Sequence, residues 1–204
     1  MGTTVNLQAE SSVITKEYYP VEKSGTVVLT NGQQNWEYKS MGKSNIDGKQ
    51  VYAVDVYITD RKGSNRSYRD KQLYSINKQG DIYQEGRMTA NQKVEWNLQP
   101  YLVLKGKMEI GQKYVDNKDA YSEHAIVLKG LKTVRIGKKI YNNCLEIEDK
   151  LVFDKRKLPD TTDINTISYY AKGKGLVKCT VKTYNYKNGK LKTVDKSAES
   201  WLVR

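Results

Sequence analysis

The one histidine of the chain, His124, is the first candidate for chemistry, because a serine or cysteine triad would need its imidazole as general base. No G-x-S-x-G sequence, which presents a nucleophilic serine on a sharp turn, occurs in the chain. In the alternating stretch around it, His124 shares a face with Ile126 and Leu128. We therefore expect a structural histidine and no catalytic residue of this class.

Acidic residues offer a second kind of chemistry, since paired carboxylates can hydrolyse glycosidic bonds. Glu146 and Glu148 share one face of a predicted strand, next to Asp149. Alternating acids on a strand are also ordinary solvent-facing residues. We interpret the protein as one that is not an enzyme, and the alternative is a hydrolase with paired carboxylates.

Metal and cofactor sites are not indicated by the residue types. Zinc needs three or four nitrogen or sulfur ligands, and one histidine with two distant cysteines does not supply them. The glycine-rich segment 172–175 lacks the G-x-x-x-x-G-K-[ST] pattern of a phosphate-binding loop. We expect neither a metal nor a cofactor.

The two cysteines differ in their predicted surroundings. Cys179 shares a strand face with Val177 and Val181, which predicts a small buried side chain. Cys144 alternates with Asn142 and Glu146, a more polar face. Two free thiols and one disulfide are both consistent with this pattern.

Basic and aromatic side chains alternate along residues 176–186, on the face opposite Val177, Cys179 and Val181. Lysine neutralises phosphate and tyrosine offers a stacking plane, a combination found on nucleic-acid platforms and at membrane or glycopolymer surfaces. The candidates for binding a ligand or polyanion are Lys178, Lys182, Tyr184, Tyr186, Lys190 and Lys192.

A secondary basic patch is predicted at Arg61, Lys62, Arg66 and Arg69. The net charge is +12, and the last 34 residues hold nine Lys or Arg against two Asp or Glu. Such an imbalance favours an anionic neighbour. A solvated lysine-rich face that only keeps the protein soluble explains the same composition.

Hairpin signals and alternating side chains predict an all-β or β-dominated α+β fold built as an antiparallel meander. Turn dipeptides such as Asn31-Gly32 and Asn188-Gly189 recur between short strands. Only 160–168 and the extreme N-terminus could host a turn of helix. The predicted strand faces are Tyr52, Val54, Val56 and Ile58, then Val94, Trp96, Leu98 and Leu102.

Weak internal similarity predicts that the chain is a duplicated meander. Residues 47–52 resemble 136–141, and residues 18–21 resemble 100–103. The predicted organisation is a flexible segment over 1–17 and one β-rich unit over 18–204, with repeats over 18–99 and 100–204. Gly-Lys turns recur by chance in a lysine-rich chain, which is the other explanation.

Five phrases occur in an order that resembles secreted or lipid-anchored β-rich proteins of Gram-positive bacteria. These phrases are Tyr18-Tyr19-Pro20-Val21 with Gly25, Trp36-Glu37-Tyr38, residues 48–52, residues 141–147 and residues 169–178. The chain departs from that pattern in lacking a Trp after Gly25 and in having Lys174 where Ile or Val is common. The resemblance implies a sheet curled into a half-barrel, or two packed sheets, as in lipoprotein-carrier-like folds, and it implies no catalytic residues.

The resemblance also implies an extracellular or cell-surface location, with a signal segment removed before residue 1. A native cytosolic start would look the same, and no stretch approaches the roughly 18 apolar residues of a membrane-spanning helix. We expect a non-enzymatic binding or structural protein of the bacterial envelope. Its candidate partners are a lipid or other apolar ligand and a cell-wall polyanion, and the alternative is nucleic acid bound by the C-terminal Lys/Tyr face.

Overall fold

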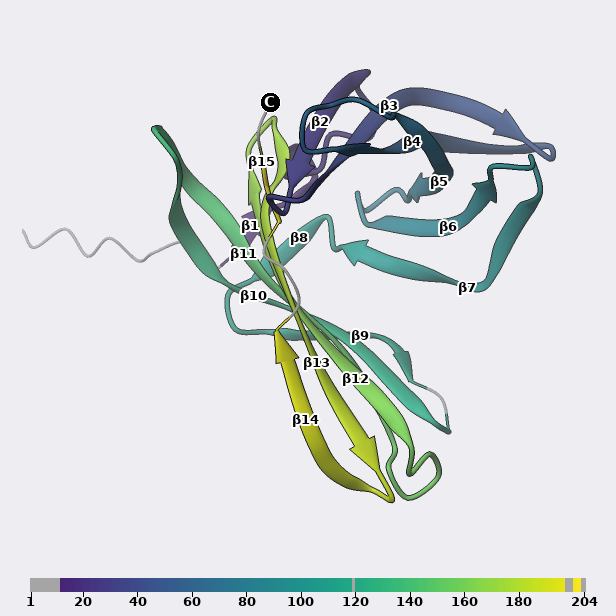
Figure 1. The fold of residues 1–204 in the computed structure, drawn as a ribbon, viewed down its shortest axis with the longest axis vertical. Helices are drawn as coiled ribbons and strands as arrows, with labels where there is room; N and C mark the ends of the chain where they lie inside the picture. The colour runs from purple at the N-terminus through teal and green to yellow at the C-terminus, as the bar shows by residue number, and fades with distance from the viewer. Residues whose placement is uncertain (1–11, 119, 197–199, 203–204) are drawn as a thin grey trace, which may run out of the picture.

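The chain folds almost wholly into antiparallel β-strands, which confirms the predicted fold class (Figure 1). This computed structural model describes residues 12–118, 120–196 and 200–202. Its one helical turn within those ranges is the 3-10 helix η1 (Lys16–Tyr18). The strands are β1 (Ser12–Ile14), β2 (Gly25–Thr30), β3 (Gln34–Ile46), β4 (Lys49–Asp60), β5 (Ser67–Ile76), β6 (Ile82–Thr89), β7 (Val94–Leu104), β8 (Lys107–Glu109), β9 (Lys113–Lys118), β10 (Ser122–Ile136), β11 (Lys139–Phe153), β12 (Thr161–Ala171), β13 (Gly175–Lys187), β14 (Lys190–Lys196) and β15 (Ser200–Leu202).

Two meanders form one 13-stranded sheet in the order β7-β6-β5-β4-β3-β2-β15-β13-β12-β11-β10-β9, with β14 also paired to β13. The short strand β15 joins the meanders, since Trp201 pairs with Thr30 of β2 and with Lys178 of β13. Figure 1 shows β2–β7 in one lobe and β12–β14 in a long arm. The boundary expected between repeats at residues 99 and 100 falls inside β7, and the internal duplication stays a prediction.

The two end strands of the sheet, β7 and β9, approach each other. The backbone N–H of Leu102 in β7 donates to Oδ2 of Asp116 in β9 at 2.8 Å. The sheet is therefore nearly closed into a barrel-like shape. The main core lies against this closure and consists of Tyr18, Leu102, Leu104, Met108, Ile126, Leu128, Leu145, Ile147 and Tyr170.

The N-terminal segment contacts β8 and the main core from residue 12 onward, and we call residues 12–18 the N-terminal anchor. β1 pairs with β8, and Thr15 is completely buried, with its N–H donating to the carbonyl of Gly106 at 3.0 Å. Tyr18 enters the main core. Residues 12–17 of the segment predicted to be flexible thus form a strand and the start of η1, because β8 supplies backbone partners and the core accepts the tyrosine. Residues 1–11 lie outside the described part.

The sequence predicted that Leu98 shares one strand face with Val94, Trp96 and Leu102. This prediction is wrong for Leu98, whose relative exposure is 104%. Trp96 pairs with Gly86 but Tyr101 pairs with Gln84, so residues 97–100 bulge from β7 and leave the alternation. The segment 160–168, expected to allow a helical turn, lies mainly in β12.

The polar face predicted for Cys144 is also wrong. Asn143 has φ of 53° in a β-bulge, so Asn142 leaves the alternation with Cys144. Cys144 is completely buried, while Glu146 on the same face is half-buried. Cys144 packs in a cluster with Val134, Ala171 and Val177. Cys179 is half-buried, and both cysteines are free thiols.

Gly106 allows the closest backbone approach around the N-terminal anchor. A Cβ there would lie 2.0 Å from the carbonyl oxygen of Gln79 and 2.8 Å from the carbonyl carbon of Gly80. Its N–H donates to Oδ1 of Asp81 at 2.8 Å, so the backbone cannot move away without losing that bond.

We expect Gly106→Ala to lower the free energy of unfolding by at least about 2 kcal/mol, because the added methyl displaces backbone. The matched control is Gly25→Ala, where a Cβ meets nothing within 4 Å and which should change stability by less than about 1 kcal/mol. Urea denaturation followed by circular dichroism measures both. Equal free energies of unfolding for the two variants would contradict the close approach of Gly106 to the backbone of residues 79 and 80.

Candidate ligand cavity and histidine–aspartate cluster

A cavity of about 470 Å³, here called the tyrosine cavity, lies between the first meander and the β12–β13 turn. Strand alternation builds its walls, because Val27 and Leu29 of β2 and Tyr38 and Ser40 of β3 point to the same side. The other residues that line it are Tyr19, Pro20, Val21, Lys23, Ser24, Gly25, Thr26, Val54, Gln72, Tyr74, Tyr170, Gly173, Lys174, Gly175 and Leu176.

The segment 19–24 forms one wall of the tyrosine cavity and is tied to both sides of it. Ser40 Oγ donates to the carbonyl oxygen of Val21 at 2.9 Å. Gly175, with φ of 80°, lies against the ring of Pro20, and a Cβ there would approach its Cδ to 3.4 Å. The turn and this segment therefore fit closely, which keeps the wall in place.

Three tyrosine rings form the floor of the cavity. Tyr19 meets Tyr74 and Tyr170 edge-on, with ring centroids 5.8 Å and 5.7 Å away. The Tyr19 hydroxyl donates to the Tyr74 hydroxyl at 3.2 Å, and Tyr74 donates to Oε1 of Gln72 at 2.5 Å. Burial raises the pKa of Tyr74 and of Tyr170 well above the usual value, so both hydroxyls stay neutral donors.

Tyr38 and two lysines give the cavity polar groups that have no hydrogen-bond or ion-pair partner among the described residues. Burial, the largest cause, raises the pKa of Tyr38 to about 12, and its hydroxyl makes no hydrogen bond to any described residue. Lys23 and Lys174 are exposed, and neither has an ion-pair partner in the described chain. The cavity thus combines an apolar wall, one free hydroxyl and two cationic groups.

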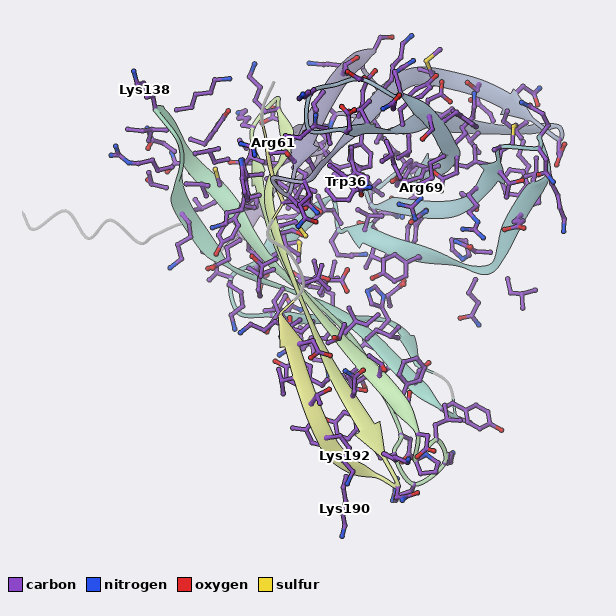
Figure 2. The ribbon with its side chains drawn as sticks, viewed as in Figure 1. Trp36, Arg61, Arg69, Lys138, Lys190 and Lys192 are labelled. Carbon is purple, nitrogen blue, oxygen red and sulfur yellow. The ribbon has the colours of Figure 1, made fainter. Side chains whose placement is uncertain are left out.

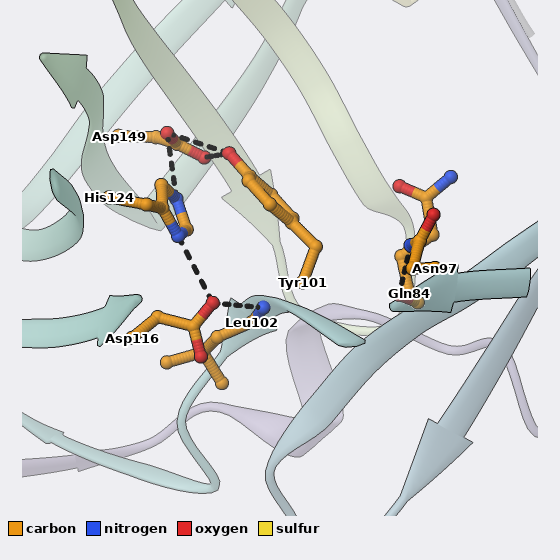
Figure 3. Close-up of polar contacts among 7 residues, drawn as sticks. All are labelled: Gln84, Asn97, Tyr101, Leu102, Asp116, His124 and Asp149. Carbon is orange, nitrogen blue, oxygen red and sulfur yellow. Dashed lines mark hydrogen bonds and ion pairs between the residues drawn. The ribbon is translucent and has the colours of Figure 1, made fainter. Parts of the chain in front are cut away.

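A buried histidine connects the strands that close the sheet (Figure 3). His124 of β10 is 2% exposed, with Nδ1 3.1 Å from Oδ2 of Asp116 in β9 and Nε2 3.2 Å from Oδ1 of Asp149 in β11. Tyr101 of β7 stacks on the imidazole at 4.0 Å and donates its hydroxyl to Asp149 at 2.7 Å. Four strands therefore meet in this histidine–aspartate cluster.

Burial alone would lower the pKa of His124, but hydrogen bonds to Asp116 and Asp149 and their negative charges outweigh burial and raise it to about 9. Both ring nitrogens face carboxylate oxygens, as an imidazolium requires, since it donates from both. Such a ring offers no lone pair to a substrate, and its burial agrees with the structural role expected from the sequence. Within the described ranges, no three His, Cys, Asp or Glu side chains form a group that could hold a metal ion.

The acids considered for hydrolysis each have partners in the protein, and strand alternation separates Asp149 from Glu146 and Glu148. Glu148 pairs with Lys150 at 2.8 Å, and Glu146 accepts from the Tyr169 hydroxyl at 2.8 Å, while Asp149 faces His124. Burial would raise the pKa of Glu148, but bonds from Lys150 and Asn165 lower it overall. A general acid needs a raised pKa, so Glu148 does not suit that role.

The predicted Lys/Tyr candidates lie along one hairpin. Lys178, Lys182, Tyr184 and Tyr186 alternate along β13, and Lys190 and Lys192 follow on β14. Figure 2 shows Lys190 and Lys192 at the far end of this hairpin. Tyr186 is covered by Lys155, whose Nζ lies 4.4 Å from the ring centroid, so this tyrosine is not a free stacking plane.

The structure divides the secondary basic patch. Arg61, Lys62 and Arg66 line a second cavity, whereas Arg69 does not. Val56 pairs with Asp70 but Tyr57 pairs with Tyr68, so Arg69 is the extra residue of a β-bulge and leaves the alternation of β5. Figure 2 shows Arg61 and Arg69 apart.

The phrases that carried the sequence resemblance supply much of the tyrosine cavity. Tyr19, Pro20, Tyr38, Tyr170 and Gly175 all line it. Sequence reasoning singled out these residues but gave them no binding role. Their convergence depends on strand pairing between the meanders, which no local pattern reveals.

No protein-family model and no curated protein matches the chain. A solved structure from Bacteroides fragilis, described as an exported protein with a YmcC-like fold, is 12% identical, covers 91% of this chain and 96% of its own, and has a TM-score of 0.45. Another from Parabacteroides distasonis, described as a lipoprotein, is 14% identical with the same coverage, 91% and 96%, and a TM-score of 0.43. Likenesses this distant carry no functional argument, and the resemblance to Gram-positive proteins stays a prediction.

The histidine–aspartate cluster makes stability depend on pH. Because the folded-state pKa of about 9 exceeds the ordinary 6.5, the stabilisation is complete below pH 6.5 and is lost as pH rises through 9. We expect the wild type to lose roughly 3 kcal/mol of unfolding free energy over this range. His124→Gln should be less stable at pH 6 and lack this loss. Urea denaturation from pH 6 to 9 tests this, and parallel profiles for both proteins would contradict it.

Proposed function

We propose that the chain is a non-enzymatic binding protein of the bacterial envelope whose tyrosine cavity holds an amphipathic ligand with an apolar body and an acidic end. The observation that supports it most is the unbonded Tyr38 hydroxyl in an apolar cavity that also has Lys23 and Lys174 in its lining. Tyr38 is half-buried, so a ligand in the cavity can reach its hydroxyl and form the hydrogen bond that no described residue forms.

Size and chemistry are consistent with this ligand class. The cavity of about 470 Å³ falls within the roughly 300–1,000 Å³ of small-molecule sites. Val27, Leu29 and Val54 would bury an acyl chain or similar body, at about 25 cal/mol for each Å² of apolar surface removed from water. A carboxylate or phosphate at the other end would pair with the exposed lysines.

Export to the envelope is part of this proposal and rests on the sequence resemblance. Within the described ranges, no helix is long and apolar enough to cross a membrane. The absence of an enzymatic role is likewise proposed, supported by the ion pairs of Glu148 and by the double hydrogen bonding of His124.

Ser40→Trp should fill the tyrosine cavity and weaken binding of palmitic acid by at least about tenfold. The matched control is Lys39→Trp, which places the same ring on the opposite, exposed face of β3. Native mass spectrometry of the purified wild type, followed by lipid extraction, first asks whether an acyl compound co-purifies. Titration with palmitic acid then compares the variants, with circular dichroism to check folding.

Equal binding by Ser40→Trp and Lys39→Trp would place the acyl compound elsewhere. No co-purifying species and no binding of palmitic acid by the wild type would contradict the proposed ligand class.

A second candidate function is polyanion binding by the β13–β14 hairpin, favoured by the exposure of Lys182, Lys190 and Lys192. Counterion release makes such binding fall steeply with salt.

Lys190→Gln with Lys192→Gln should reduce the slope of log affinity against log salt for a poly(dT) oligonucleotide by about 0.7 for each phosphate that is no longer neutralised. Lys43→Gln with Lys138→Gln removes the same charge from other exposed sites, and an equal effect would show that only net charge matters.

A further inference from the structure

A second cavity, of about 480 Å³, lies on the face of β2 and β3 opposite the tyrosine cavity. Strand alternation separates the two, since Val28 and Thr30 line this one while Val27 and Leu29 line the other. We call it the Trp201 cavity. Its lining is Val28, Thr30, Gly32, Asn35, Glu37, Thr59, Arg61, Lys62, Gly63, Arg66 and Trp201.

The β4–β5 turn brings two cations to the Trp201 cavity in a defined conformation. Asp60 organises the turn, because its Oδ1 accepts from the N–H of Ser64 at 2.8 Å and its carbonyl accepts from the N–H of Gly63 at 3.0 Å. Arg61 and Lys62 project from this turn, and neither has an ion-pair partner in the part of the chain described.

Arg66 adds a third cation whose position is fixed. It pairs with Glu37 at 2.9 Å and lies over the ring of Tyr57, with its guanidinium carbon 3.4 Å from the centroid. Three cationic groups against the single carboxylate of Glu37 leave the lining positively charged. A guanidinium matches carboxylate or phosphate oxygens in a forked geometry, so Arg61 can bind such a group directly.

Trp201 supplies an aromatic plane beside these cations. It is half-buried on β15, paired with Thr30, and a Cβ at Gly32 would lie 4.0 Å from its Cη2. Glycine at position 32 therefore places no side chain against this edge of the indole. Asn35, which lines the same cavity, donates its Nδ2 to the carbonyl of Asp60 at 3.0 Å, so its Oδ1 remains an acceptor.

We propose that the Trp201 cavity binds an acidic sugar, with the ring of the sugar against Trp201 and its carboxylate or phosphate on Arg61 and Lys62. An indole offers an apolar surface that suits the C–H face of a sugar, while Asn35 and Thr59 suit its hydroxyl groups. Single-stranded nucleic acid is less suited, because such platforms stack successive bases on several rings and this lining has one. This site goes beyond the tyrosine cavity and does not depend on the ligand proposed there.

The test is titration of the full chain with digalacturonate and with glucose 6-phosphate, followed by heteronuclear NMR of the indole N–H groups. We expect the Trp201 signal to shift with both acidic sugars.

Arg61→Gln with Lys62→Gln, at exposed turn positions, should weaken binding by at least about tenfold, because both charge-assisted hydrogen bonds to the anion are removed. Lys43→Gln with Lys138→Gln removes the same charge at exposed positions outside both cavities and should leave binding unchanged. Trp201→Phe removes the indole N–H of residue 201, so the signal that disappears is the Trp201 signal, and the variant keeps an aromatic ring.

Three results would overturn the proposal. They are equal binding of neutral maltose, equal binding of inorganic phosphate alone, and binding that survives Arg61→Gln with Lys62→Gln. A poly(dT) oligonucleotide that shifts the Trp201 signal at lower concentration than either sugar would assign the cavity to nucleic acid instead. Binding of palmitic acid in the same samples is scored separately, so failure here is distinguishable from failure of the tyrosine cavity.

Discussion

The ion-paired histidine in the middle of the protein is the interaction on which the closed sheet depends. His124 lies between Asp116 and Asp149, and Tyr101 covers it, so strands β7, β9, β10 and β11 share one set of bonds. A buried charge is costly unless it is paired and hydrogen-bonded, and both ring nitrogens are. The closure shields the main core, from which Tyr170 extends to the floor of the tyrosine cavity.

The two cavities follow from the same closed sheet and from the period of two along its strands. Neighbouring residues of β2 and β3 point to opposite sides, so one pair of strands carries a tyrosine-lined wall and a Trp–Arg wall. The first suits an apolar body and the second suits an anionic, hydroxyl-rich group. On both proposals, the protein would contact an amphipathic molecule and an acidic glycan at once.

The strand class and the structural role of His124 could be predicted from the sequence, because alternation and turn dipeptides are local signals. The errors at Leu98 and Cys144 arose at bulges, where extra residues interrupt the alternation and no local pattern marks the interruption. The separation of Arg69 from Arg61 has the same cause. The cavities could not be predicted, since Tyr19, Tyr74 and Tyr170 come from segments far apart in the chain that only the tertiary fold brings together.

The most direct test of the central claim, that the tyrosine cavity is the binding site, is NMR of protein with ring-labelled tyrosine during titration with palmitic acid. The signals of Tyr19, Tyr38, Tyr74 and Tyr170, which all line the cavity, should shift together. Tyr57 and Tyr68, which meet edge-on and do not line that cavity, should not move. Shifts confined to Tyr57 and Tyr68, or no shifts at saturating ligand, would contradict it.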